Sequence, residues 1–232
     1  MRVLFLGEGD LDGPARYLAA ILRWAEIPFD HRPDQAPIPR SWQRRSYGLF
    51  ILSDYRASSF SQSAVRWLTH EVQEKGSGLL MIGGWASFTG LVGGYAGHSL
   101  EKLLPVRCVP KDDRVHRAAV LVGVHSVRPI VVCGYHRAQA KAGTETRLHF
   151  QELASSGGRL ILKKPRSALV YGRAGRGRTA AFLTDCAPHW AGGLVDWGAR
   201  RIMVHLPGAG SVELGNGYLE FFRKLFLDLR KK

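Results

Sequence analysis

Short runs of apolar residues recur along the chain, and the stretches between them place apolar residues three or four positions apart. A run without polar alternation is typical of a strand that is buried on both faces of a sheet. Such runs predict buried strands at residues 2–7, 47–53, 78–82 and 179–184. A shorter apolar segment predicts one more strand at residues 29–31.

The segments between the first predicted strands have apolar residues at helical spacing. One helix is predicted between Asp12 and Pro28, and a second that begins at Ser61 or Ser63 and ends at Gly76, because each segment begins with a capping residue and ends at a helix breaker. Strands that alternate with helices predict a parallel sheet with right-handed crossovers. A last helix is predicted near the C-terminus from a wide apolar stripe that must pack on the sheet, formed by Tyr218, Phe221, Phe222, Leu225, Phe226 and Leu229.

The pattern changes between residues 117 and 171, where short strands and turns predominate. We interpret residues 117–171 as a β-rich insertion within the same domain. The loop 172–178 is rich in Gly and Arg but lacks the Lys-Ser/Thr ending of a phosphate loop, so it predicts a hairpin turn. A further hairpin is predicted around Pro207-Gly208. The strands predicted in the β-rich insertion are 119–124, 129–132, 146–150, 159–162 and 168–171.

Composition indicates one globular domain spanning residues 1–232, since 45% of the residues are hydrophobic and can form a sizeable core. No apolar run is long enough to cross a bilayer, and the N-terminal segment has the pattern of a first strand rather than of a signal peptide. Cys108, Cys133 and Cys186 have no disulfide-framework spacing, which favours free thiols in a reducing compartment. We therefore expect a cytoplasmic protein with no membrane partner.

The chain is strongly basic, with 33 Lys and Arg against 19 Asp and Glu and a net charge of +14. Such a charge attracts anions, so a basic nucleic-acid-binding module is one alternative function. The basic residues are spread over several segments, around 40–45, 163–166, 173–178 and 230–232. Because nucleic-acid sites concentrate charge and exposed aromatic residues on one surface, we do not expect nucleic acid to be the partner.

The segment Gly78–Gly90, GLLMIGGWASFTG, is the strongest candidate for a functional site. Its strand stops at Gly83-Gly84, where the backbone can turn sharply. In α/β sheets, ligands usually bind where central strands end, and enzymes with a nucleophile elbow place the reactive Ser or Cys at this turn. Here the tip of the elbow is Trp85 and Ala86, and neither is a nucleophile.

Four segments together resemble one known family: LLMIGGWASFTG, HSLEKLLPV, PKDDRV and VYGRAGRGRTAAFLTDCAPHW. They are similar to the glutamine amidotransferase-like family, a branch of the class I glutamine amidotransferase-like superfamily. The resemblance implies an α/β fold, a three-layer sandwich with a flavodoxin-like, mainly parallel sheet. It also implies a Cys at the elbow, activated by a His that is followed by a Glu. Since this chain has neither the elbow Cys nor a His-x-Glu at His189, we expect that it is not a glutaminase.

Polar and aromatic residues follow the carboxyl ends of the predicted parallel strands, and we expect them to converge on one strand-end rim. We predict that this rim binds a small polar metabolite or a partner protein, and that the protein forms homo-oligomers. An aromatic lining is common at ligand sites and at subunit contacts. The predicted ligand-binding residues are Glu8, Asp54, Gly84, Trp85, Phe88 and Trp190.

A hydrolase is the alternative function at the same rim. In this hypothesis Ser87 is the nucleophile, His189 the general base, and Asp185 or Asp54 the residue that orients His189. It requires a hydrogen bond between the Ser87 hydroxyl and the His189 imidazole. The competing interpretation is that Ser87 caps a turn and His189 packs locally.

Two Cys-x-x-His pairs, Cys133–His136 and Cys186–His189, offer ligand types that suit zinc, but neither pair has zinc-finger spacing. We therefore predict no metal and no cofactor. The acidic pair Asp112-Asp113 beside Arg114 is interpreted as a loop salt bridge, with an acid–base pair or a hard-metal site as alternatives.

Overall fold

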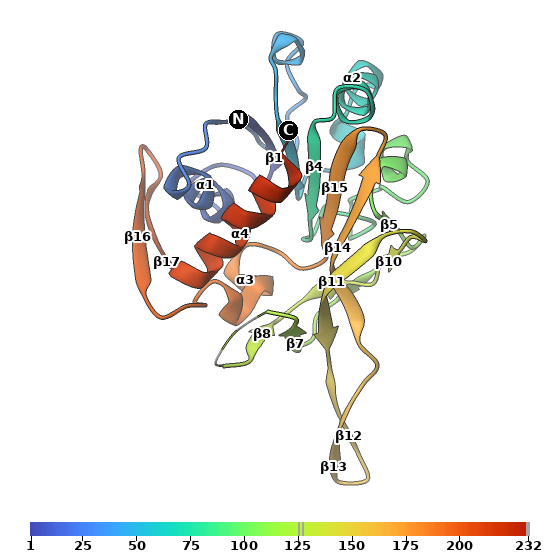
Figure 1. The fold of residues 1–232 in the computed structure, drawn as a ribbon, viewed down its shortest axis with the longest axis vertical. Helices are drawn as coiled ribbons and strands as arrows, with labels where there is room; N and C mark the ends of the chain where they lie inside the picture. Colours follow the sequence, from blue (N-terminus) through green and yellow to red (C-terminus); the bar gives the residue numbers. More distant parts are fainter. Residues whose placement is uncertain (125, 127, 231–232) are drawn as a thin grey trace.

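A mixed nine-stranded sheet forms the centre of the structure, a computed structural model that describes residues 1–124, 126 and 128–230. The strand order is β2-β1-β3-β4-β15-β14-β11-β7-β8 (Figure 1). Five strands at one end are parallel: β2 (Phe29–Arg32), β1 (Val3–Gly7), β3 (Leu49–Ser53), β4 (Gly78–Ile82) and β15 (Gly177–Phe182). The four strands at the other end are antiparallel to their neighbours: β14 (Arg166–Ala174), β11 (Glu145–Gln151), β7 (Ala119–Val122) and β8 (Ile130–Val132).

The predicted strands of the parallel core are confirmed. Strands β1, β3, β4 and β15 are neighbours in the sheet, and every residue of β1, β3 and β4 is buried. In the pairing of β4 with β15, Leu79 lies opposite Thr179 and Ile82 opposite Phe182. All these strands therefore end at the same edge of the sheet, and the loops that follow them are brought together.

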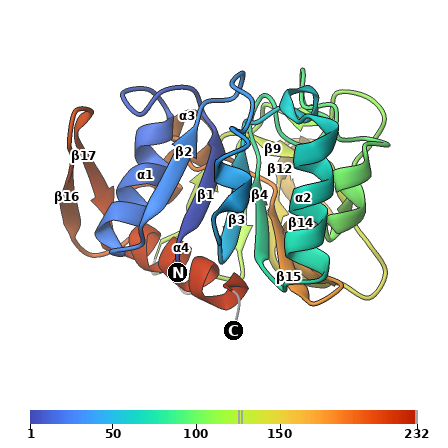
Figure 2. The ribbon, with the colours of Figure 1, turned by 90° about the horizontal axis from the view of Figure 1, so that it is seen from above.

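Helices cover both faces of the parallel half. Figure 1 shows α1 (Ala15–Trp24) and α4 (Asn216–Leu229) on one side and α2 (Gln62–Gln73) on the other, and Figure 2 shows the same arrangement from above. The Ser61 hydroxyl caps α2 by accepting a hydrogen bond from the Ala64 amide at 3.2 Å, as its position predicts. The aromatic stripe of α4 packs on the sheet, where the Phe222 ring lies 5.7 Å from the Phe182 ring.

The segment predicted as a β-rich insertion does consist of strands, and several of them extend the central sheet. The predicted hairpin turn at 172–178 is much tighter than expected, because β14 and β15 pair as far as Ala174 and Gly177 and leave only Gly175 and Arg176 at the turn. The hairpin predicted around Pro207-Gly208 is formed by β16 (Arg201–Leu206) and β17 (Gly210–Gly215). Strands β12 (Leu153–Ser156) and β13 (Arg159–Leu162) form a further hairpin that projects from the body of the molecule (Figure 1).

Two short strand pairs that the sequence did not predict lie outside the central sheet. Strand β6 (Arg114–Val115) pairs with β9 (Tyr135–His136), and β5 (Val106–Arg107) pairs with β10 (Gln139–Ala140). The remaining short elements are η1 (Trp42–Arg44), η2 (Ala57–Ser59), η3 (Ser99–Leu103), α3 (Pro188–Ala191) and η4 (Gly192–Leu194). Among the residues described, no helix has the length and apolar character needed to cross a membrane. Residues 231–232, the end of the predicted basic tail, lie outside the described part.

Candidate functional site

The elbow after β4 is built by the two glycines that the sequence singled out. The Gly83 amide donates hydrogen bonds to the carbonyls of Phe182 and Thr184, at 2.8 and 2.9 Å, which joins the elbow to the end of β15. Gly84 has a φ of +149°, and a Cβ there would lie 2.3 Å from Asp54 Oδ1. Only glycine fits at this position, because the backbone must pass directly beside the Asp54 carboxylate.

At the tip of the elbow, the Trp85 side chain is 46% exposed. The Arg114 guanidinium lies over its ring, 4.6 Å from the ring centroid, and the His116 ring lies 5.9 Å away. Arg114 comes from β6, so the unpredicted β6–β9 pair supplies one side of the elbow. Arg114 Nη1 is buried and donates no hydrogen bond to a described residue, although the same guanidinium pairs with Asp112 through Nη2 at 2.7 Å.

Three carboxylates, Glu8, Asp54 and Asp185, meet where β1, β3 and β15 end, and we call them the acid cluster. Glu8 accepts a hydrogen bond from the Ser53 hydroxyl at 2.6 Å, and Asp54 Oδ1 accepts one from the Ala86 amide at 2.7 Å. Asp185 Oδ1 accepts from the amides of Cys186 and Ala187. The structure therefore brings together the acids that the strand ends predicted.

Burial and mutual repulsion change the acidity of this cluster. Burial raises the pKa of Glu8 well above its usual value, and the nearby charges of Asp185 and Asp54 raise it further. The pKa of Asp54 is raised to about 7, first by burial and then by the charge of Asp185. The pKa of His189 is raised, mainly because its ring lies beside Asp185. The cluster is therefore poised to hold protons or another cation at neutral pH.

Ser87 and His189 are not brought together as the hydrolase hypothesis requires. The Ser87 side chain is buried, and its hydroxyl oxygen accepts a hydrogen bond from the Asp54 amide at 3.0 Å. His189 Nε2 instead lies 3.0 Å from Asp185 Oδ2. Within the described residues no hydrogen bond joins Ser87 to His189, so of the proposed triad only the contact between Asp185 and His189 is present.

The predicted ligand-binding residues divide into an exposed and a buried group. Trp85 is exposed and Asp54 partly exposed, whereas Glu8, Gly84, Phe88 and Trp190 are buried. The last two pack beneath the elbow, with their rings 4.9 and 5.2 Å from the ring of His136. Their side chains therefore support the elbow from below rather than line an open surface.

A buried pair, Asp113 and His136, supports the elbow, and no pattern in the sequence predicted that these two residues contact each other. His136 Nδ1 lies 2.8 Å from Asp113 Oδ1, while Nε2 lies within 3.1 Å of the Gly84 amide. Asp113 Oδ1 also accepts a hydrogen bond from the Gly90 amide at 3.0 Å. The loop salt bridge predicted for Asp112-Asp113 is thus correct for Asp112 only. Both residues of the buried pair stood out in the sequence, but only the β6–β9 pairing brings them together.

None of the three cysteines lies at the tip of the elbow. Cys133 is exposed, and Cys108 and Cys186 are buried. Burial raises the pKa of the Cys186 thiol well above its usual value, and the charge of Glu8 raises it further, so the site opposes formation of a free thiolate. The ring of His136 is engaged by Asp113 and Gly84, so the pair Cys133–His136, considered above as a possible zinc site, does not offer a free imidazole.

Residues 46–204 match the model of a family described as "Putative glutamine amidotransferase". The chain belongs to this glutamine amidotransferase-like family. The resemblance noted in the sequence is therefore confirmed. No curated protein matches the sequence.

Among solved structures, this family member is similar over the full length of both chains to two proteins from Salmonella typhimurium. One is Cytoplasmic Protein STM1381 of strain LT2, with 24% identity, a TM-score of 0.73 and 100% coverage of each chain. The other is Cytoplasmic Protein STM3548, with 23% identity, a TM-score of 0.76 and the same coverage. Agd3, a carbohydrate deacetylase, matches at 13% identity and a TM-score of 0.51, over 78% of this chain and 29% of its own. These likenesses show a shared fold.

Proposed function

We propose that this glutamine amidotransferase-like protein binds a small polar metabolite at the strand-end rim and does not hydrolyse glutamine. The elbow presents an indole where the superfamily reaction needs a thiolate. The one buried thiol near the rim, Cys186, is held by the carboxylate of Glu8 rather than by an imidazole, with Sγ 3.8 Å from Oε1. A carboxylate neighbour opposes thiolate formation, so the arrangement disfavours a cysteine nucleophile.

Backbone strain is the observation that carries the binding half of the proposal. Four non-glycine residues in the described chain have a positive φ, and three of them, Glu8, Asp54 and Phe88, lie at or beneath the rim, with φ of 64°, 54° and 50°. Such conformations persist only where the surrounding structure imposes them, and they cluster at functional sites. Here two of the three residues carry carboxylates of the acid cluster, and Asp54 contacts the elbow directly by accepting a hydrogen bond from the Ala86 amide.

Unpaired buried polar atoms support the same location. Seven buried side-chain polar atoms of the described residues lack a hydrogen-bond partner, and three of them, Asp113 Oδ2, Arg114 Nη1 and Asp185 Oδ2, belong to side chains around the elbow. Buried polar atoms are nearly always paired, so unpaired ones at one place favour a site for a bound molecule or ion. A polar ligand can pair with both acceptors and donors of this set.

We also propose a superfamily fold and a cellular compartment for this protein. The proposal assigns the class I superfamily fold to this chain, as a three-layer sandwich in which residues 117–171 are an insertion. It places the protein in the cytoplasm, which the names of the two Salmonella proteins support. That the protein forms homo-oligomers stays a prediction.

The binding half is tested by thermal melting in the presence of a panel of proteinogenic amino acids, nucleotides and sugar phosphates. We expect at least one compound to raise the melting temperature of the wild-type protein and to have no effect on Trp85→Ala. The matched control is Trp42→Ala, which removes a partly buried indole far from the elbow and should respond like the wild type. Equal stabilisation of Trp85→Ala, or no stabilisation by any compound, would count against a ligand site at the rim.

A further inference from the structure

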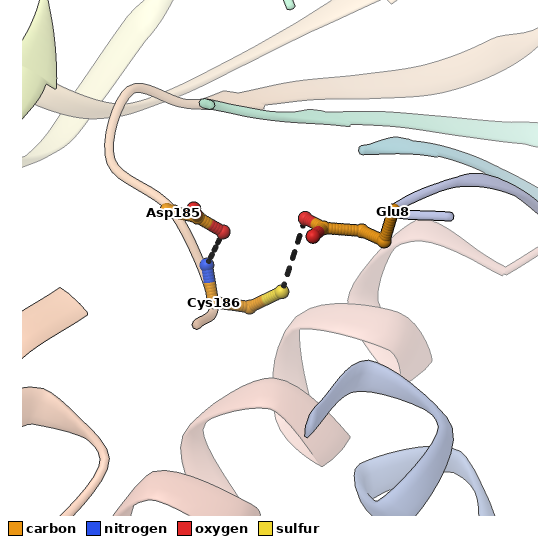
Figure 3. A group of neighbouring side chains, drawn as sticks. All are labelled: Glu8, Asp185 and Cys186. Atoms are coloured by element: carbon orange, nitrogen blue, oxygen red, sulfur yellow. Dashed lines mark hydrogen bonds between the residues drawn. The ribbon is translucent and has the colours of Figure 1, made fainter. Parts of the chain in front are cut away.

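The side chains of Glu8, Asp185 and Cys186 form a compact group of metal-ligand types at the base of the rim (Figure 3). One ligand atom from each side chain can be chosen so that all three lie within 4.8 Å of one another. Two carboxylate oxygens and a sulfur come from the ends of β1 and β15, which are far apart in sequence and fixed by the sheet. All three side chains are buried, with exposures of 5%, 0% and 0%.

This part of the molecule carries more negative charge than its neighbours neutralise. Glu8 and Asp54 form no salt bridge within the described residues, and Asp185 has only His189 beside it. Arg114, Asp113 and His136 also face the elbow, but Arg114 is paired with Asp112, and His136 with Asp113. Burying carboxylates without a cation is strongly unfavourable, so the cluster needs either protons or a metal ion.

An unpaired oxygen of Asp185 is the independent sign of a bound cation. Its Oδ1 is saturated by the amides of Cys186 and Ala187, at 2.6 and 3.0 Å. Its Oδ2 is buried and accepts no hydrogen bond from a described residue, even though His189 Nε2 lies 3.0 Å away. Because the contact with His189 does not have hydrogen-bond geometry, this buried carboxylate oxygen is available as a metal ligand.

The group is also held in place before any ion arrives. Glu8 is fixed by its positive φ and by the Ser53 hydroxyl, which donates to it at 2.6 Å. The backbone of Cys186 is fixed by the Tyr218 hydroxyl, which donates to the Cys186 carbonyl at 2.6 Å. In metal sites, the residues that bind the ion are generally oriented by hydrogen bonds from neighbouring residues that do not bind it. His189, which lies beside Asp185, is suited to orient Asp185 in this way.

We propose that Glu8, Asp185 and Cys186 bind a divalent first-row transition metal ion, with zinc as the ion that suits them best. A thiolate excludes magnesium and calcium, which prefer oxygen ligands, whereas zinc accepts carboxylate oxygen and sulfur together. Binding releases the thiol proton of Cys186 to solvent, and its sulfur donates an electron pair to the metal. Glu8 and Asp185 bind as carboxylates, so any proton that they share leaves as well.

The first measurement is the metal content of the full-length protein purified from zinc-supplemented cells, followed by replacement of zinc with cobalt. We expect about one zinc ion per chain, and a near-ultraviolet thiolate-to-cobalt charge-transfer band in the cobalt protein. Cys186→Ser should abolish the band and lower zinc affinity by at least about tenfold. Cys133→Ser is the matched control, since it removes the exposed cysteine of the other Cys-x-x-His pair and should leave both properties unchanged.

A second variant keeps the proposal testable if Cys186→Ser does not fold. In the double variant Cys108→Ser, Cys133→Ser, Cys186 is the only thiol, so a cobalt–thiolate band in that protein assigns the metal to Cys186. The proposal is overturned by a protein that retains no zinc, by a cobalt spectrum without the band, or by a band that survives in Cys186→Ser. None of these results bears on glutamine hydrolysis or on ligand stabilisation through Trp85, so the two proposals fail separately.

Discussion

Replacing Gly7 with Ala is expected to lower the free energy of unfolding by about 4 kcal/mol or more. A Cβ at this position would lie 1.5 Å from the carbonyl oxygen of Ser53, which is a backbone atom of the neighbouring strand β3. The φ of Gly7 is +119°, a conformation that side chains rarely adopt. Relief of the clash would separate β1 from β3 just where Glu8 and Asp54 leave the sheet.

Gly9→Ala provides the matched control, two residues further along the same loop. Its φ is +66°, but nothing lies within 4 Å of a Cβ built there, so only the left-handed backbone opposes the change. We expect Gly9→Ala to lower the free energy of unfolding by about 1–2 kcal/mol. Urea denaturation followed by circular dichroism compares the two variants. Similar losses in both would show that β1 and β3 do not approach each other as closely as described.

The second large effect is expected for Asp113→Ala, which removes the partner of a buried histidine. His136 Nδ1 and the Gly90 amide would both lose their acceptor in a region without solvent access. Because both buried groups would then have no hydrogen-bond partner, we expect Asp113→Ala to lower the free energy of unfolding by about 3 kcal/mol. Because His136 also contacts Gly84 and the ring of Trp190, we expect the intrinsic tryptophan fluorescence of the folded variant to change.

Asp112→Ala is the matched control, which tests whether the loss of stability is specific to the buried Asp113. Asp112 is adjacent in sequence and pairs with Arg114, but its side chain is 45% exposed. Water can reach the Asp112 side of this pair, whereas the Arg114 side chain is only 9% exposed. We therefore expect Asp112→Ala to lower the free energy of unfolding in urea by about 1–2 kcal/mol, less than Asp113→Ala. If the two neighbouring acids had equal effects, the elbow would not depend on the pair Asp113–His136.

The parallel core could be predicted from sequence because its signals are local. Leu79–Ile82 is apolar without a break, and the glycines after it predict a sharp turn whatever the rest of the chain does. In the antiparallel half, the strands corresponding to β7, β8, β11 and β14 were predicted close to their observed positions. Strand β12 (Leu153–Ser156) was not predicted, because a short segment that ends in two serines resembles a loop. The hairpin turn at 172–178 was placed too broadly, since Arg173 and Arg178 are compatible with an exposed strand as well as with a turn.

The candidate site shows the same division. Strand ends predict that Glu8, Asp54 and Asp185 converge, because parallel strands that are neighbours end at one edge. No local pattern predicts that Arg114 lies over Trp85 or that Asp113 contacts His136. Both contacts depend on β6 and β9, two-residue strands whose pairing is decided by tertiary structure. The triad of Ser87, His189 and Asp185 was a hypothesis about geometry, and sequence does not report that the Ser87 hydroxyl is already engaged by the Asp54 amide.

The central claim is that this elbow has no nucleophile. The most direct test uses 6-diazo-5-oxo-L-norleucine, a glutamine analogue that alkylates catalytic cysteines. The protein is incubated with this compound and its cysteines are then examined by peptide mapping. Glutamate release from L-glutamine is followed in the same preparation. We predict no adduct on Cys108, Cys133 or Cys186 and no glutamate above the buffer blank. An adduct on any of these residues, together with glutamate release that the adduct abolishes, would contradict the account.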